Sequence, residues 1–180
     1  MRNRTLLALA GAAAFLVQPQ LAAAQQACVA EDEVKAMAIY AVPSMVRSVQ
    51  LTCGAQLSQN GWLARDSGAL SQRYAAMQGR VWPKAKAALL KMVNGPGVDA
   101  RAAQTLATVA NLPDQNIRPL VDALIVQEVS AKIPVAECGK IERIREAIAP
   151  IEPDVAGSLI GAAASLFADK APAICPARPT

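Results

Sequence analysis

Four cysteines are the residues of this sequence whose chemistry is most easily assigned. Cys28, Cys53, Cys138 and Cys175 form an even set, and none belongs to a Cys-x-x-Cys redox motif. An even number of cysteines in an exported domain is typical of structural disulfides. A redox-active thiol is the alternative, but no histidine or paired cysteine is present to lower a thiol pKa. We therefore expect two disulfide bonds.

The pairing of these cysteines depends on the path of the chain at Pro43. A tight hairpin there places Cys28 and Cys53 together at its open end, and Cys138 and Cys175 then close the last pair of helices. A single kinked helix instead separates Cys28 from Cys53 by more than about 30 Å, so Cys53 bonds Cys138 or Cys175. We prefer the local pairing, although the apolar spacing crosses Pro43 without a change of phase.

Catalytic signatures are missing from the sequence. The chain has no histidine, which removes the commonest general base, the commonest zinc ligand and every Ser-His or Cys-His nucleophile. Glu142 and Glu146 share a helix face, as a carboxylate pair for acid–base chemistry does. The neighbouring Arg143 and Arg145 favour a solvated charged face instead. We expect no catalytic residue, no metal site and no cofactor.

One set of basic residues has regular helical spacing. Arg73, Arg80, Lys84 and Lys91 are 7, 4 and 7 positions apart, which places all four on one stripe of a helix. We interpret this cationic strip as a candidate surface for an anionic partner, either an envelope protein or an anionic lipid surface. The alternative is an ordinary solvated face. Nucleic acid is not expected, because no stacking aromatic residues are interleaved with the basic ones.

The elements that position these residues begin after an export signal, residues 1–24. Arg2 and Arg4 precede an apolar run of 12 residues, 6–17, and a small-residue site places the cut between Ala24 and Gln25. A membrane-spanning helix needs roughly 20 apolar residues, so no transmembrane anchor is expected after cleavage. These features predict a periplasmic or secreted protein. The oligomeric state is not predicted.

Residues 25–180 are expected to form a single helical domain. Without the two leader arginines, 16 basic residues remain against 14 acidic ones, a net charge of +2, so basicity gives no strong indication of a partner. A turn-forming segment, Asn94–Gly97, is the strongest break, and it indicates a possible organisation in two parts.

The fold class follows from composition and spacing. Aromatic residues make up only 3% of the chain, and no alternating pattern indicates a strand, so small aliphatic side chains must fill a helical core. Acidic residues 31–33 indicate one helix start, and Asp114 or Asn116 indicates another. We predict a compact all-α bundle of six to seven short helices cross-linked by two disulfides.

The segment after Pro153 has a distinct pattern. Residues 155–168 carry no charge and are apolar nearly all round, yet they are too few to span a membrane. We therefore expect a buried central helix. Gly157 and Gly161 are spaced for close approach of a neighbouring helix of the same chain.

These observations leave three functional hypotheses. The first is an exported, non-enzymatic protein of interaction or structural type, which the missing catalytic residues favour. The second is a small-ligand or lipid-binding helical bundle, because Ala-rich helices can surround an apolar cavity. The third is a carboxylate-dependent hydrolase, which requires two facing Asp or Glu residues in a cleft.

Overall fold

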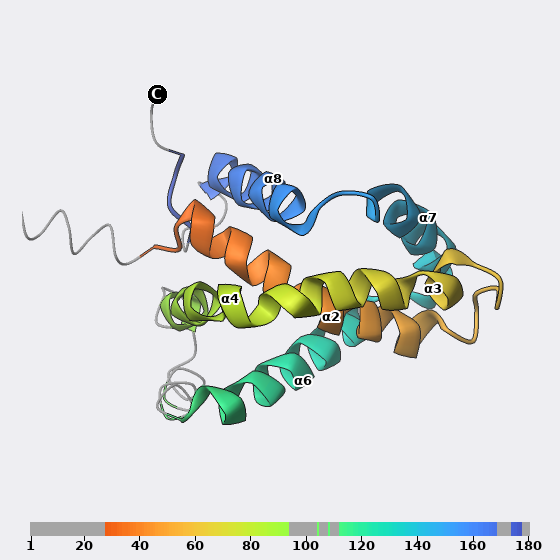
Figure 1. The fold of residues 1–180 in the computed structure, drawn as a ribbon, viewed down its shortest axis with the longest axis horizontal. Coiled ribbons are helices and arrows are strands. Elements are labelled where there is room, and N and C mark those ends of the chain that lie inside the picture. The colour runs from red at the N-terminus through yellow and green to blue at the C-terminus, as the bar shows by residue number, and fades with distance from the viewer. Residues whose placement is uncertain (1–27, 94–103, 105–107, 109–111, 169–173, 178–180) are drawn as a thin grey trace, which may run out of the picture.

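The computed structural model describes residues 28–93, 104, 108, 112–168 and 174–177. Its elements are α2 (Glu31–Cys53), α3 (Trp62–Arg65), α4 (Ser67–Val93), α6 (Asp114–Lys132), the 3₁₀ turn η1 (Val135–Glu137), α7 (Cys138–Ile148) and α8 (Pro153–Leu166) (Figure 1). Strands are absent from these residues, and the two predicted disulfides are present. The all-α prediction is confirmed. The export signal, the cut after Ala24 and the break at 94–97 lie outside the described residues.

α2 is the central helix of the fold. α4, α6 and α8 each pack against it, from different sides (Figure 1). Its buried residues therefore face several directions along its whole length: Ala36, Ile39, Tyr40, Ser44, Val46, Ser48, Val49 and Cys53. The start of the helix is fixed by Glu33, whose carboxylate accepts a hydrogen bond of 2.8 Å from the backbone N–H of Ala30. The acidic cluster predicted to begin a helix does begin α2.

Pro43 lies inside α2, and the helix continues through it. A proline in a helix interior removes one backbone hydrogen bond and costs about 3 kcal/mol. Burial of a large side chain contributes about 1.5–3 kcal/mol, and Ile39, Tyr40 and Val46 are all buried within four residues of Pro43. Packing on three sides therefore offsets the local cost, and no hairpin forms.

The continuous path of α2 decides the disulfide pairing. A helix of 23 residues is about 35 Å long, so Cys28 and Cys53 lie at opposite ends of α2. Cys28 bonds Cys175, and Cys53 bonds Cys138. The preferred local pairing was wrong, and the observed bonds are one of the two pairings that a continuous helix allows.

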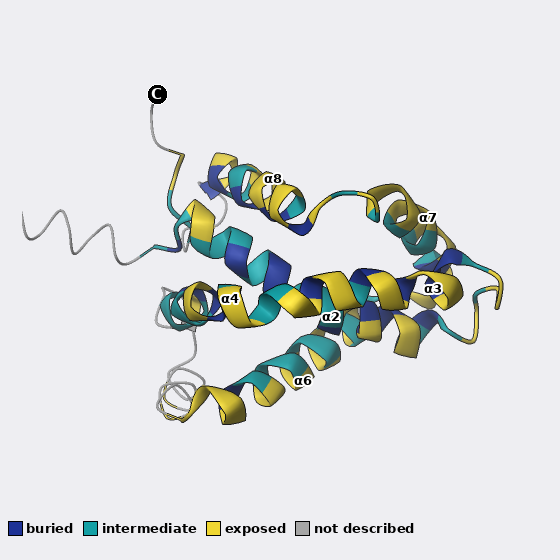
Figure 2. Ribbon diagram, viewed as in Figure 1, coloured by how far each residue is buried: buried dark blue, intermediate teal, exposed yellow. Residues whose placement is uncertain are grey.

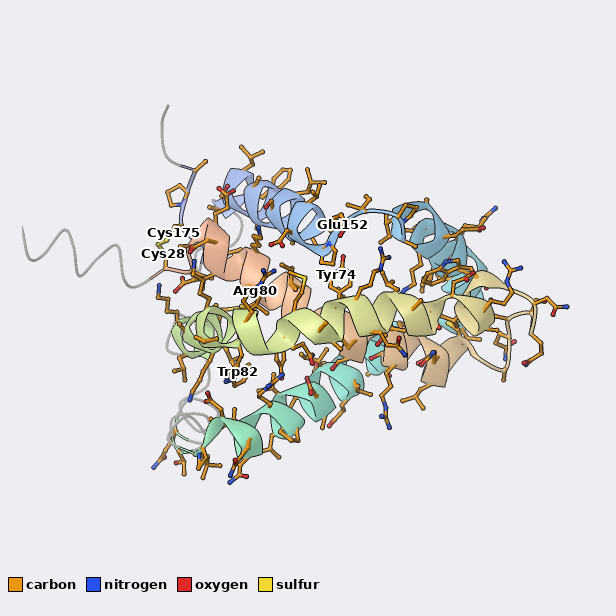
Figure 3. All side chains as sticks on the ribbon, viewed as in Figure 1. Cys28, Tyr74, Arg80, Trp82, Glu152 and Cys175 are labelled. Carbon is orange, nitrogen blue, oxygen red and sulfur yellow. A yellow bond between two sulfur atoms is a disulfide. The ribbon has the colours of Figure 1, made fainter. Side chains whose placement is uncertain are left out.

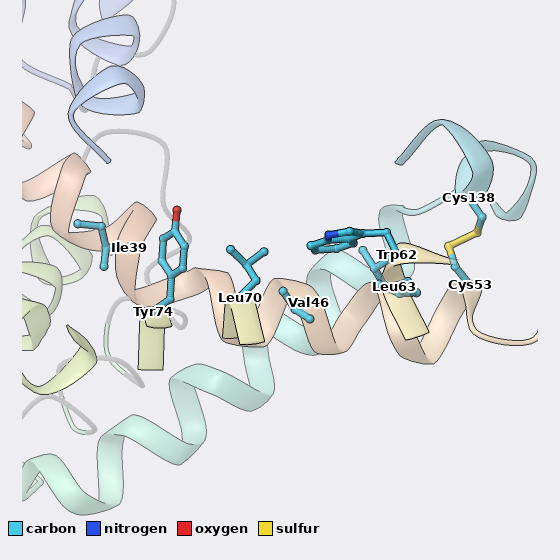
Figure 4. Close-up of a cluster of buried hydrophobic side chains, with 9 residues drawn as sticks. Ile39, Val46, Cys53, Trp62, Leu63, Leu70, Tyr74 and Cys138 are labelled. Carbon is cyan, nitrogen blue, oxygen red and sulfur yellow. A yellow bond between two sulfur atoms is a disulfide. The ribbon is translucent and has the colours of Figure 1, made fainter. Parts of the chain in front are cut away.

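Two buried clusters hold the helices on α2. The larger contains Trp62, Leu63, Leu70 and Tyr74, which pack along α2, with Trp62 and Leu63 nearest the Cys53–Cys138 bond and Tyr74 nearest Ile39 (Figure 4). The smaller lies nearer the start of α2 and brings together five residues of three helices: Ala36, Tyr40, Trp82, Ala85 and Ile117.

α8 lies on the outside of the bundle, with its small residues facing α2. Gly157, Gly161 and Ser165 are buried, whereas Val155 and Leu159 are exposed (Figure 2). A Cβ atom at Gly161 would lie 2.6 Å from the backbone oxygen of Glu31. The expectation of a buried central helix was wrong, because the absence of Cβ atoms lets α8 approach α2 by its small face. Close packing of both glycines within the chain is confirmed.

The two ends of the described chain meet beside the start of α2. Cys28 and Cys175 are bonded with their Cα atoms 5.1 Å apart, and the backbone N–H of Cys175 donates to the oxygen of Val29 at 2.9 Å (Figure 3). Val29 is 1% exposed. Across the described ranges, no helix has both the length and the apolar character needed to cross a membrane.

Candidate functional site

An open groove of about 970 Å³ lies along α2, between α4 and α6. Its floor comes from α2, because α4 and α6 each pack chiefly on that helix. Near the far end of α4, Trp82 points toward α6 and contacts Ile117 (Figure 3). The groove is lined by Pro43, Ser44, Val46, Arg47, Gln50, Leu51, Gly68, Ser71, Gln72, Ala75, Gln78, Pro119, Asp122, Ala123 and Val126.

A ladder of hydrogen bonds positions α6 on the groove floor. Three hydroxyl groups of α2, spaced four residues apart, donate to three residues of α6 that are also spaced four apart. The two helices therefore run parallel in a fixed register. The bonds are Tyr40 Oη to the oxygen of Arg118 at 3.4 Å and Ser44 Oγ to Asp122 Oδ1 at 3.2 Å. Ser48 Oγ shares its one proton between the oxygen of Ser44 in its own helix at 2.9 Å and the oxygen of Val126 at 3.3 Å. Ile117 is the buried apolar residue of α6. Polar pairing therefore supplements a small apolar contact.

The groove combines an apolar surface with amide and charged groups. Leu51 is 64% exposed there. Gln50 donates to Ser67 Oγ at 3.0 Å, and Gln78 donates to the oxygen of Tyr40 at 2.9 Å, so both amides are held in place. Arg47 is exposed, and among the described residues no ion pair includes it. The groove thus presents fixed amides and one available cation.

Aromatic and cationic groups lie next to one end of the groove. The rings of Tyr40 and Trp82 are 4.9 Å apart, and the Arg118 guanidinium lies 5.8 Å from the centre of each. Burial raises the pKa of Tyr40 to about 12, because the phenolate would lose hydration there. This cluster joins α2, α4 and α6 and fixes their separation.

The predicted cationic strip is occupied by partners of the same chain. Arg80 pairs with Asp154 at 3.1 Å (Figure 3), and Lys91 pairs with Glu33 at 2.8 Å. Lys84 pairs with Asp32 and lowers the pKa of that carboxyl group, and Arg73 donates to the backbone oxygen of Ala149. These four residues connect α4 to the start of α2 and to the α7–α8 region. Their use by an anionic partner stays a prediction.

Carboxylates in the described residues occupy structural positions. Glu142 of α7 accepts a hydrogen bond of 3.2 Å from the backbone N–H of Leu63 and so caps α3, while Glu146 is exposed. Of the described residues that line the groove, Asp122 is the single carboxylate, whereas a two-carboxylate mechanism requires a second acid. Among all the residues that the structure describes, no group of three potential ligands is placed to hold a metal ion.

The groove residues were not found from the sequence. Seven of the fifteen are alanine, serine or glutamine, which carry no chemical signature. Ser44 and Ser48, one helical turn apart and both buried in α2, are the signal that was available, because buried hydroxyl groups need partners.

Fold and site define the class as a disulfide-bonded all-α protein with an open interhelical groove. Two disulfides fit a protein that folds in an oxidising, extracytoplasmic compartment. Comparison with known protein families, curated proteins and solved structures found no match.

Proposed function

We propose that this is an exported, non-enzymatic binding protein whose groove takes a segment of an envelope protein. In this proposal the leader is cut between Ala24 and Gln25, and the protein acts in the periplasm or outside the cell. The observation that carries the proposal is the open groove between α4 and α6. The two disulfides support an oxidising location outside the cytoplasm.

The shape and composition of the groove favour a helical or extended polypeptide as occupant. Helices that bind in grooves place apolar residues at helical spacing against an apolar floor. Here Leu51, Ala75 and Ala123, which are all exposed, supply that apolar surface. Gln72 is exposed along the edge of the groove, where its amide can bond backbone groups of an extended segment.

Arg47 specifies the charge of that segment. Its guanidinium is exposed at the groove without an ion pair among the residues that the structure describes, whereas Lys35, Arg80 and Lys84 are all paired with carboxylates. A guanidinium binds a carboxylate through two parallel hydrogen bonds. We therefore propose an amphipathic segment with an acidic residue that meets Arg47.

Site-specific photo-crosslinking in the native envelope tests this proposal. A photoreactive residue replaces Ala75, which lines the groove, or Ala76, which is exposed on the same helix outside it. We expect one protein to be captured from position 75 and not from position 76. The cross-linked segment is then synthesised as a peptide, and its binding is measured by calorimetry.

Arg47→Glu is the decisive variant. It replaces attraction by repulsion, and we expect it to weaken peptide binding about tenfold, which is about 1.4 kcal/mol. Arg65→Glu is the matched control, because Arg65 is also exposed but lies on α3 outside the groove. Equal capture from both positions, or equal affinity of both variants, contradicts the proposal. A small molecule retained in native mass spectra, and lost on Ala75→Trp, would favour the ligand-binding hypothesis instead.

A further inference from the structure

The outer face of α8 has the composition of a buried surface. The helix turns Gly157 and Gly161 toward α2, whereas its large apolar residues are exposed. Exposed stretches of α8 are yellow in Figure 2. Val155 is 53% exposed, Leu159 59% and Leu166 71%. An ordinary surface helix has the opposite arrangement, with apolar residues inward and polar residues outward. Contiguous apolar surface of this kind marks an interaction site.

We propose that this face is the interface of a homodimer in which the α8 helices of two copies pack antiparallel. The inference is independent of the proposed function, because α8 and α6 contact α2 from different sides and the groove stays open (Figure 1).

The exposed area agrees with what a stable dimer needs. Val155, Leu159, Ile160 and Leu166 are each between 49% and 71% exposed, which leaves on the order of 400 Å² of apolar surface. A standard interface buries about 800 Å² on each partner, of which a little over half is apolar. α8 therefore supplies nearly the whole apolar share of one such interface.

Charge distribution favours a second copy over a lipid surface. Residues 155–168 carry no charge, so two copies bring no like charges together along the helix. Asp154, at the start of α8, is paired with Lys35 at 3.0 Å and with Arg80 at 3.1 Å. In an antiparallel pair the two Asp154 residues lie at opposite ends, about 20 Å apart. A membrane-surface helix instead carries Lys or Arg beside its apolar face.

Side-chain sizes along α8 fit the antiparallel arrangement. When the two-fold axis passes near Gly161, Leu159 of one copy lies opposite Ala163 of the other. Both residues are exposed. Because of the two-fold symmetry, the contact between the large leucine and the small alanine occurs twice in the dimer. Each leucine then enters the space left by an alanine, as in ridges-into-grooves packing.

Sedimentation equilibrium of the oxidised protein tests the interface. We expect a dimer between about 1 and 100 µM. Leu159→Glu places two carboxylates near the two-fold axis and is expected to weaken dimerisation at least 100-fold, or about 2.7 kcal/mol. Leu124→Glu is the matched control, since Leu124 is 50% exposed on α6, and it is expected to leave the dimer unchanged.

Each other outcome overturns the inference. A wild-type monomer over the whole range contradicts it, as does a dimer that survives Leu159→Glu or that both variants dissociate equally. A monomer that sediments with vesicles of phosphatidylglycerol and phosphatidylethanolamine, and loses this binding on Leu159→Glu, would assign the face to lipid. Tryptophan fluorescence, compared between wild type and variants, establishes that each variant is folded.

Discussion

Replacing Gly161 by alanine tests the seating of α8 on α2. The new Cβ would lie 2.6 Å from the backbone oxygen of Glu31, and ordinary contact begins at 3.4 Å. A backbone oxygen cannot rotate away as the end of a side chain can. α8 must therefore move outward by about 0.8 Å, which loosens the dispersion contacts along that helix.

The magnitude follows from comparison with a glycine that has free space. A Cβ at Gly79, inside α4, meets nothing within 4 Å. Both Gly→Ala changes gain about 1 kcal/mol of helix propensity, so this gain cancels when the two variants are compared. The remaining difference is the cost of overpacking, about 1–3 kcal/mol. We expect the Gly79→Ala variant to be more stable than the wild type. We expect the free energy of unfolding of Gly161→Ala to be about 1–3 kcal/mol lower than that of Gly79→Ala.

Urea unfolding with both disulfides intact measures the difference. Trp62 is 8% exposed and Trp82 is 3% exposed, so their fluorescence reports loss of both buried clusters. With a slope of about 1–3 kcal/mol per molar urea, the two midpoints should differ by roughly 1 M. Equal midpoints would refute the reasoning, because α8 would then not hold Gly161 against Glu31.

Two further predictions concern covalent and ionisable groups. Replacing Cys53 and Cys138 together by serine opens a loop with a sequence separation of 85, and chain entropy predicts a loss of about 4–5 kcal/mol in the free energy of unfolding; a loss below about 1 kcal/mol by urea unfolding would disagree. Burial raises the pKa of Tyr40 from 10.0 to about 12, and also raises that of Tyr74. The folded state thus binds these two phenol protons more tightly than the unfolded state does. The free energy of unfolding is therefore unaffected by these groups below pH 10 and falls as the pH rises from 10 toward 12. Tyrosinate absorbance should show no step near pH 10 in the folded protein but a normal step in urea, and a native step at pH 10 would count against burial of both rings.

The sequence predicted the fold class well because that depends on local patterns. The acidic start of α2, Asp114 at the start of α6 and the even set of cysteines are all visible without knowledge of the packing. Glu128 and Lys132, one turn apart, form an ion pair at 3.4 Å. Such features involve neighbours in the chain.

The path at Pro43 was harder to predict because it depends on distant residues. The local rule disfavours a helix there by about 3 kcal/mol, and only the three helices packed around α2 reverse that balance. The unbroken apolar phase across Pro43 was the correct indication. The prediction of the cysteine pairing was wrong for the same reason, since the pairing follows directly from the path of α2.

The orientation of α8 shows what composition leaves undecided. An apolar helix predicts burial somewhere, but hydropathy does not distinguish burial within the chain from burial against another molecule. Gly157 and Gly161 carried the information about which face approaches α2. The groove was not predicted at all, because Ala75 and Ala123 acquire significance only when α4 and α6 are placed beside α2.

The nested connectivity of the disulfides sets an order for oxidation. As the chain emerges from its N-terminus, Cys28 and Cys53 become available before the other two cysteines. A bond between them would join opposite ends of α2, about 35 Å apart, and would prevent the helix from forming. The native bonds require Cys138 and then Cys175. Maturation therefore requires either that Cys28 and Cys53 do not bond each other before the later cysteines are available or that an early bond between them is exchanged.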